Sequence, residues 1–571
     1  MGDATDRQRS FWGWGYADRF PEEEARRELK DRIEGMLGFP ERPLLDPPTL
    51  EDVSIPESRL TAPDSLSGVV STATEDRIRH TYGRGYRDLV RGFHGDFSPA
   101  PDAVAEPETE SEIAGILAWA TENRVAVVPY GGGTSVVGGV ECDPEGDGAA
   151  YAGVLSLDVG NLDEVLEVDP HSRSARIQAG ATGPEIRDQL AEHDLQLRHY
   201  PQSYEFSTLG GWIATRAGGH FATVYTRIDD FVENVRMVTP AGTVETRRLP
   251  GSGAGPDPNK LILGSEGAFG VITEAWMEVQ PRPPYRARAS VHFDDFEAAV
   301  DATREIAQAR LYPANCRLLD RNEAMLNEVA MDGSHVLVLG FESTDHPVED
   351  GLARAIAIAE AHGGDLPAEP SYEGPHLADT GAESDGGEGG DGEDRADGED
   401  GANSKDGDEG DRGGSEGSWR SAFFEAPYQF NALVSLGVVV ETFETAVTWD
   451  QFPELHEAVT DRVTAAMDEA CGAGFLSCRF THVYEDGPAP YYTLLAPAEP
   501  GRELEQWRPI KAAASDAIEE SGGTTTHHHA VGRVHRDWYD RETPAEYREA
   551  LRAAKETFDP AGIMNPGALL E

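Results

Sequence analysis

Three glycine-rich segments constrain the fold of this chain more than any other feature. Residues 129–135 read PYGGGTS after an apolar run typical of a β-strand, and two further small-residue segments occupy 201–212 and 264–272. Glycine tolerates positive φ and lets backbone amides approach a ligand, and successive amides form an anion-binding nest. A lone triple glycine is commonly a turn, and the spacing lacks the G-x-G-x-x-G of the Rossmann fold. Three segments in order, about 70 and 60 residues apart, predict a phosphate cradle of another kind.

The remaining pattern predicts an α+β protein built from several units. Residues 1–95 are expected to be mostly helical, because Leu29, Ile33 and Leu37 repeat at four-residue spacing before Gly38. Helical and strand-like segments then alternate through a first unit, 96–283, and a second unit, 284–500. The final segment, 501–571, is expected to close the fold with a short helix.

The charge of the chain excludes some partners. It carries 104 acidic and 48 basic residues, a formal net charge of −56, which argues against a nucleic-acid partner and against binding to an anionic membrane. An acid-rich, lysine-poor composition is typical of halophile proteins, and only 5 of the 48 basic residues are lysine. We interpret the charge as an adaptation to solvent.

Several segments have compositions that exclude ordered or membrane structure. Residues 379–416 contain 15 acids, 3 bases and 12 glycines, so they cannot bury enough apolar surface to offset the entropy of ordering, and we predict a disordered insert over about 370–416. The chain has no run of 18 apolar residues and no apolar leader, which predicts a cytoplasmic protein without an integral membrane segment. The 4 cysteines lack metal spacing and predict no disulfide framework.

The three segments and their flanking motifs resemble the FAD-binding domain of the vanillyl-alcohol-oxidase/PCMH superfamily, in its type 4 branch. Within that branch the resemblance is to the alkyldihydroxyacetonephosphate synthase family, through Trp12-Gly13-Trp14, ETAVTW at 444–449 and HHHAVG at 527–532. It implies a two-subdomain, PCMH-type FAD-binding domain at 96–283 and an α+β, ferredoxin-like cap domain at 284–500. It also implies a C-terminal segment, 501–571, that returns to the flavin.

The resemblance implies non-covalent FAD as the cofactor, because covalent members attach flavin through a histidine or cysteine that the first segment lacks. Four loops are expected to bind it. The residues are Pro129, Tyr130, Gly131, Gly132, Gly133, Thr134, Ser135, Pro201, Gln202, Ser203, Tyr204, Glu205, Phe206, Ser207, Gly210, Gly211, Thr215, Arg216, Ala217, Gly218, Glu266, Gly267, Ala268, Phe269, Gly270, Val271 and Ile272.

The resemblance also implies catalytic roles for the triplet His527, His528 and His529 and for Tyr491. Imidazoles titrate near pH 7 and can bind a phosphate or donate protons. Adjacent histidines point apart and a zinc site requires spaced ligands, so we expect no metal, and a solvent-facing cluster is the remaining alternative. Tyr491 is expected to accept a proton from a substrate carbon.

Substrate contacts are expected from Arg479, Phe430 and Asn565. Two arginines of the family are absent, and Gly251 and Phe430 stand in their positions. Replacing a guanidinium by a phenyl ring removes a bidentate anion clamp, which is expected to weaken recognition of a dihydroxyacetone phosphate headgroup. Another arginine, Arg479 among them, could compensate.

Three functions remain open at this point. The first is transfer, in which the acyl group of acyl-dihydroxyacetone phosphate is exchanged for a fatty alcohol through a flavin N5 adduct. The second is an FAD-linked dehydrogenase of D-lactate, glycolate or another 2-hydroxy acid, whose family metal motifs survive here only as His482 and His529. The third is a flavoprotein scaffold without catalysis. The expected partner is a small-molecule or lipid substrate, and a homodimer is the assembly to test.

Overall fold

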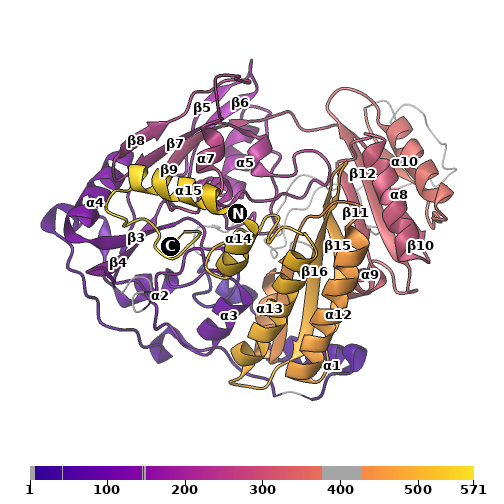
Figure 1. The fold of residues 1–571 in the computed structure, drawn as a ribbon, viewed down its shortest axis with the longest axis horizontal. Helices are drawn as coiled ribbons and strands as arrows, with labels where there is room; N and C mark the ends of the chain where they lie inside the picture. The colour runs from indigo at the N-terminus through magenta and orange to yellow at the C-terminus, as the bar shows by residue number, and fades with distance from the viewer. Residues whose placement is uncertain (1–6, 42, 144–145, 147–149, 376–426, 571) are drawn as a thin grey trace, which may run out of the picture.

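The computed structural model describes residues 7–41, 43–143, 146, 150–375 and 427–570, and their strands form three sheets (Figure 1). The strand orders are β1-β2-β4-β3, β5-β6-β9-β7-β8 and β13-β10-β12-β11-β15-β16-β14. Helices pack against each sheet, and the α+β prediction is confirmed.

The four-stranded sheet leads directly into the first glycine segment. It contains β1 (Val70–Ser71), β2 (Ala103–Ala105), β3 (Val125–Tyr130) and β4 (Gly153–Asp158), with β2, β4 and β3 parallel. Helix α4 (Glu110–Asn123) precedes β3 and begins at a capping box, in which Thr109 and Glu112 satisfy each other's backbone amides. Ile113, Ile116, Leu117 and Ala120 of α4 are buried in the core of this sheet, so the helix is fixed in place just before β3 begins.

The five-stranded sheet is antiparallel and supports the other two glycine segments. Its strands are β5 (Val165–Asp169), β6 (Ser174–Gln178), β7 (Val232–Thr239), β8 (Gly242–Glu245) and β9 (Val271–Glu278). The associated helices are α5 (Gly183–Ala191), α6 (Leu209–Thr215), α7 (Asn259–Ile262) and the C-terminal α15 (Ala545–Phe558), which lies beside this sheet in Figure 1. The second glycine segment runs into α6, and the third runs into β9.

The seven-stranded sheet is antiparallel and forms the other half of the molecule (Figure 1). Its strands are β10 (Tyr285–Phe293), β11 (Asn315–Leu319), β12 (His335–Ser343), β13 (Ser371–Glu373), β14 (Val438–Glu444), β15 (Phe475–Val483) and β16 (Pro488–Pro497). The helices are α8 (Phe296–Gln308), α9 (Arg321–Leu326), α10 (Glu349–Ala361), α12 (Phe452–Cys471), α13 (Glu503–Glu520) and α14 (Arg536–Glu542).

Alternation along these strands separates a helix-covered face from a face turned toward the glycine segments. Tyr492 stacks on Phe443 and His456 of the helix side, so its neighbour Tyr491 points the opposite way. A β-bulge between Phe480 and His482 interrupts the register of β15 and β16. A bulge re-aims the side chains that follow it, and here it turns His482 toward the same side as Tyr491.

The N-terminal region is less helical than its pattern predicts. It contains α1 (Glu23–Leu37), α2 (Thr74–Arg79) and α3 (Tyr86–Phe93). The chain between α1 and α2 is mainly extended, because its prolines are incompatible with a helix interior.

The tryptophan motif of the N-terminal region is hydrogen-bonded to the other half of the molecule. The backbone amide of Trp14 donates to Asn431 Oδ1 at 2.8 Å, and Asn431 Nδ2 returns a bond to the Trp14 carbonyl at 2.9 Å.

Two further predictions concern the acidic insert and membrane-spanning helices. Of the predicted disordered insert at 370–416, residues 376–416 lie outside the described residues. Residues Ser371–Glu373 form strand β13, which pairs with β10, so these residues of the predicted insert are ordered. In the part of the chain that the structure describes, the helices are each too short or too polar to cross a membrane.

Candidate active site

A single cavity gathers residues from both halves of the molecule. Residues of the first two glycine segments line one side of the cavity, and residues of the seven-stranded sheet line another. Tyr491, Arg317 and Arg479 come from this sheet, and His528 and His529 of the C-terminal loop lie beside Tyr491. The lining also includes Trp14, Arg84, Tyr86, Pro427, Phe430, Val440, Glu441, Thr442, Thr481 and His482.

The first glycine segment fits an anionic group. Within the described residues, the backbone amides of Gly131 to Ser135 donate to no protein acceptor, so five consecutive donors are left for a ligand. Side chains are excluded by close packing, since a Cβ on Gly132 would lie 1.8 Å from the Phe206 carbonyl oxygen. Gly133 has φ +65°, a left-handed conformation that glycine adopts without cost. The donors and the absence of side chains suit a diphosphate such as that of FAD.

The second segment divides into residues that face the cavity and residues that pack behind it. Pro201, Gln202, Ser203, Ser207, Gly211, Thr215, Ala217 and Gly218 line the cavity with the five residues Gly131, Gly132, Gly133, Thr134 and Ser135. Tyr204 lies behind this wall and donates to the Gly183 carbonyl at 2.7 Å. Arg216 pairs instead with Asp229 at 2.8 Å. Therefore only some of the residues that were expected to bind the cofactor line the cavity.

The third segment supports the site from behind. Glu266, which has φ +50°, accepts the backbone amides of Val531 at 2.8 Å and Gly532 at 2.7 Å. Burial raises the pKa of Glu266 to about 7, and these two amides oppose the rise. Residues 266–272 do not line the cavity. The carboxyl group ties this segment to the loop that carries the histidine triplet.

Asn565 does not line this cavity. Its Nδ2 donates to the Gly139 carbonyl at 3.1 Å and to the Glu266 carbonyl at 2.6 Å. Its backbone amide donates to the Val127 carbonyl of β3 at 2.8 Å, so the residue connects β3 to two loops. The expected substrate contact of Asn565 stays a prediction.

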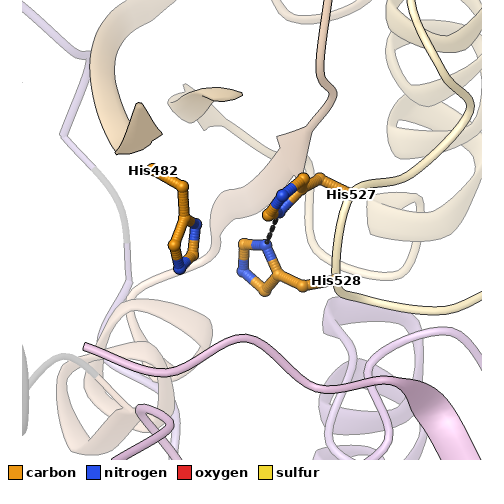
Figure 2. Close-up of side chains that lie close together, drawn as sticks. All are labelled: His482, His527 and His528. Atoms are coloured by element: carbon orange, nitrogen blue, oxygen red, sulfur yellow. Dashed lines mark hydrogen bonds between the residues drawn. The ribbon is translucent and has the colours of Figure 1, made fainter. Parts of the chain in front are cut away.

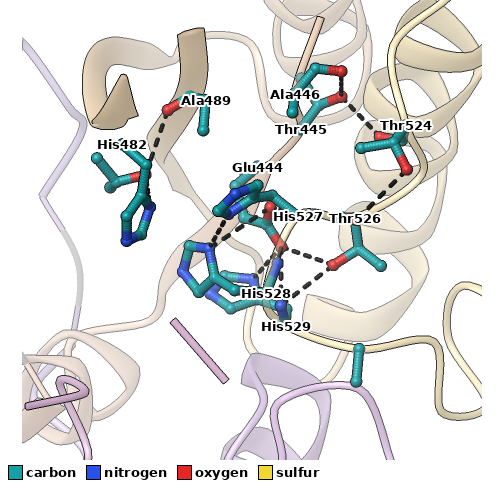
Figure 3. Close-up of polar contacts among 12 residues, drawn as sticks. Glu444, Thr445, Ala446, His482, Ala489, Thr524, Thr526, His527, His528 and His529 are labelled. Carbon is teal, nitrogen blue, oxygen red and sulfur yellow. Dashed lines mark hydrogen bonds and ion pairs between the residues drawn. The ribbon is translucent and has the colours of Figure 1, made fainter. Parts of the chain in front are cut away.

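The histidine triplet is held by one buried carboxylate, Glu444, the last residue of β14 (Figure 3). Glu444 accepts the backbone amides of His527, of His528 at 3.1 Å and of His529 at 2.9 Å, and the Thr526 hydroxyl at 2.6 Å. Burial favours the protonated acid, but the three imidazoles and the Thr526 bond together hold the pKa of Glu444 well below its ordinary value. The loop therefore wraps around a charged anchor.

The side chains of His527 and His528 are hydrogen-bonded to each other, with His482 beside them (Figure 2). His527 Nδ1 lies 3.0 Å from His528 Nδ1, and His527 Nε2 lies 2.7 Å from the Tyr484 hydroxyl. Burial, with the neighbouring His528, lowers the pKa of His527 to about 3, and burial also lowers the pKa values of His528 and His529. The resting cluster is neutral at pH 7.

The same cluster could accommodate a metal. The nitrogens of His482, His527 and His528 lie within 4.8 Å of one another. His482 Nε2 already contacts the Gly219 carbonyl at 3.2 Å, and the bond between His527 and His528 occupies the facing nitrogens. The expectation that the site binds no metal stays a prediction.

Tyr491 lies between two kinds of neighbour on the cavity wall. Its ring stacks on His528 with a centroid separation of 5.9 Å and an interplanar angle of 18°, and the Arg479 guanidinium lies 3.9 Å from its centroid. Burial raises the pKa of Tyr491 and Arg479 opposes this. Arg479 also donates to the buried carboxylate of Glu323, so part of its guanidinium is already occupied and is not available to a substrate anion.

Three residues at the site were not predicted from the sequence. Arg317 of β11 is 1% exposed, lines the cavity and donates to the His220 carbonyl. Glu444 lies inside a motif noted for its resemblance, but its role as the anchor of the histidine loop follows only from the fold. The Tyr484 hydroxyl meets His527 because β15 and the C-terminal loop converge. Gly251 is exposed and distant from any neighbour, so its position gives no cavity contact.

Two family models match this chain. Residues 101–247 match the FAD binding domain, and residues 282–369 and 397–569 match the C-terminal domain of FAD linked oxidases. These two matches place the chain among the FAD-dependent flavoenzymes, and its cofactor is FAD.

Similar proteins place the chain more narrowly. The alkyldihydroxyacetonephosphate synthase of Caenorhabditis elegans is 30% identical over 514 residues, covering 88% of this chain and 82% of that protein. The glycolate oxidase subunit GlcD of Bacillus subtilis is 25% identical over 481 residues, 83% and 90% respectively. A solved alkyldihydroxyacetonephosphate synthase has a TM-score of 0.76 at 24% identity, covering 98% of each chain, and agrees in fold. The chain belongs to the alkyldihydroxyacetonephosphate synthase family, within the vanillyl-alcohol-oxidase/PCMH superfamily of FAD-dependent enzymes.

Proposed function

We propose that this chain exchanges the acyl group of acyl-dihydroxyacetone phosphate for a fatty alcohol, giving an ether and a free fatty acid. The observation that carries the proposal is the arrangement of Tyr491, His528 and His529 around one cavity that the phosphate-binding segment also lines. The similarity to the synthase family over most of both chains supports it.

The proposed cofactor is non-covalent FAD, held by the five amides of residues 131–135 and by the second glycine segment. Bound there, FAD would supply an electron-accepting ring system at the carbon whose substituent is exchanged. The protein would hold that ring in the cavity, exclude water and move protons.

Tyr491 is the proposed proton acceptor for the substrate carbon. Because burial raises its pKa, the phenol is protonated at rest and becomes a strong base once ionised, and Arg479 stabilises that ionised form. His528 and His529 are neutral and are proposed to bind the headgroup and exchange protons with the alcohol.

The two ends of the substrate would meet different surroundings. Trp14, Tyr86, Phe430 and Val440 supply an apolar stretch of the lining suited to an alkyl chain, and Phe430 enlarges it where the family carries arginine. Arg317 supplies a buried cation in the same lining and is the proposed contact for the phosphate.

A second candidate is oxidation of a 2-hydroxy acid, with a histidine as base and electrons passing to the flavin. It is favoured by the loss of the arginine at Phe430 and by the similarity to the glycolate oxidase subunit. A small carboxylate could use Arg317 and Arg479 without the apolar wall.

The test is an anaerobic visible spectrum of the FAD-loaded protein in high salt, before and after acyl-dihydroxyacetone phosphate is added. Bleaching with release of free fatty acid, followed by ether formation on adding a fatty alcohol, supports transfer. An unchanged spectrum that bleaches with D-lactate or glycolate replaces it with oxidation. Phe430→Arg is the matched variant, expected to raise affinity for the phosphorylated substrate.

Further properties are proposed from composition. The acidic, lysine-poor chain is proposed to function in concentrated salt in the cytoplasm, with a small-molecule or lipid substrate as its partner, and to form a homodimer. Activity and stability that rise together with potassium chloride concentration would support the halophilic assignment, and sedimentation would decide the assembly.

A further inference from the structure

We propose that His528, His527, Tyr484, Thr226 and Asp230 form a proton relay between the cavity and solvent. The inference rests on the proposed function, because it concerns the proton that the transfer reaction releases. It assigns a role to Tyr484, which neither the histidine triplet nor Tyr491 accounts for.

The chain of contacts is continuous. His528 Nδ1 lies 3.0 Å from His527 Nδ1, and His527 Nε2 lies 2.7 Å from the Tyr484 hydroxyl. That hydroxyl donates to Thr226 Oγ1 at 3.5 Å, and Thr226 Oγ1 donates to Asp230 Oδ2 at 3.4 Å. The last two contacts exceed the usual O–H···O range, so proton transfer is expected to be slowest there.

Burial changes along the relay in the order that a proton would need. His528 lines the cavity, His527 and Thr226 are buried, Tyr484 is half-buried and Asp230 is exposed. Each histidine bonds through one nitrogen and has a second nitrogen for the next partner, and each hydroxyl can accept one proton while giving up another. Tyr484 donates to Thr226 and Thr226 donates to Asp230, so the donors from Tyr484 onward point toward solvent.

The reaction requires such a route. The bond between the substrate carbon and the acyloxy oxygen breaks, the acyl group leaves as a carboxylate, and the alcohol oxygen bonds to that carbon and loses its proton. One proton is therefore released in the cavity per turnover. In the relay, His528 Nε2 takes a proton while its Nδ1 proton passes to His527, and successive hydroxyls deliver one proton to Asp230.

Low basicity of the middle groups suits transit. Burial lowers the pKa of His527 to about 3, so a proton does not rest there. The charged and titratable groups facing the relay come from several elements. They are Arg216, Arg227, Asp229, Arg317, Glu444, Arg479, His482, Tyr491 and His529.

The test compares proton release with fatty acid release in the FAD-loaded protein, using a pH-indicator dye in weak buffer. Tyr484→Phe keeps the ring beside His527 but removes the hydroxyl, and Thr226→Val breaks the next step. Tyr312→Phe is the control, since its exposed hydroxyl contacts Glu485 in the adjoining loop. We expect Tyr484→Phe to lower turnover by roughly 100-fold, the lower end of a positioned acid–base contribution.

Two readouts separate a relay from a structural contact. The solvent isotope effect on turnover should increase in Tyr484→Phe, and added imidazole or formate should restore its rate, while flavin bleaching by the substrate stays normal. Wild-type turnover in Tyr484→Phe, or a loss that small buffers do not restore, overturns the relay. So does loss of wild-type activity on chelation with recovery on adding zinc, which would make the histidines metal ligands. If the wild-type protein releases no fatty acid, the proposed function fails first.

Discussion

Replacing Glu444 by glutamine is expected to disable the site while leaving the fold. The carboxylate accepts four donors, three on Oε1 and the His527 amide on Oε2. Glutamine keeps one oxygen and turns an NH2 group toward the fourth donor. Hydrogen bonds to a charged group contribute about 1.5–3 kcal/mol each and neutral ones about 1 kcal/mol. Losing one bond and weakening three therefore costs at least about 3 kcal/mol, concentrated in residues 526–529.

The assay measures turnover and FAD content of Glu444→Gln in high salt, together with the free energy of unfolding in urea. A reorganised histidine loop predicts a fall in turnover of at least about 100-fold, at the conversion of 1.4 kcal/mol per factor of ten, with FAD still bound. Glu454→Gln, an exposed carboxylate in the first turn of α12, controls for the loss of one charge. Turnover within threefold of wild type would refute the reasoning that this carboxylate orients the triplet.

Three other changes have defined outcomes. Tyr491→Phe should abolish proton abstraction while FAD remains bound, and wild-type activity should rise with alkaline pH because burial raises the pKa of Tyr491, as a pH–rate profile would show. Gly132→Ala places a Cβ 1.8 Å from the Phe206 carbonyl, so flavin absorbance of the purified protein should be lost, whereas Gly251→Ala, in open space, should retain it. The free energy of unfolding should fall as pH drops below about 6.5. Burial lowers the folded pKa values of His199 and His535 to about 3, so between these pH values only the unfolded chain binds protons, at up to about 1.4 kcal/mol per histidine per pH unit. In thermal melts, the melting temperature of His535→Gln should decline less steeply with falling pH than that of the wild type.

Local patterns in the sequence predict the parts of this fold whose causes are local. An apolar run followed by three glycines predicts β3 and the turn after it, because strand propensity and positive φ are properties of a few adjacent residues. The prolines after α1 likewise predict extended chain. The region was nevertheless expected to be mostly helical, because the apolar repeat of one helix was extended over residues whose packing is set by other segments.

The site depends on contacts that no local pattern contains. His482 reaches the cavity because of a bulge in β15, and a one-residue shift in register would turn it to the helix side. Glu444 contacts residues more than eighty positions later in the chain, and the backbone amide of Asn565 bonds to Val127 of β3, far earlier in the chain. The resemblance to the family indicates candidate site residues such as Tyr491 and the histidine triplet. The hydrogen-bond partners of the triplet, Glu444 and Tyr484, follow only from the folded structure.

The clasp between Trp14 and Asn431 implies an order of assembly. These residues are 417 positions apart, and the cavity that Trp14 lines also needs His528, so its walls come from both early and late parts of the chain. Chain closure over such separations is slow, and a growing polypeptide exposes its first sheets long before the last wall is made. During synthesis, the first glycine segment, residues 129–135, therefore stays exposed to solvent until residues 526–529 have been synthesised. Flavin capture by a nascent chain and acquisition of activity should be separate events, with the second confined to the finished protein.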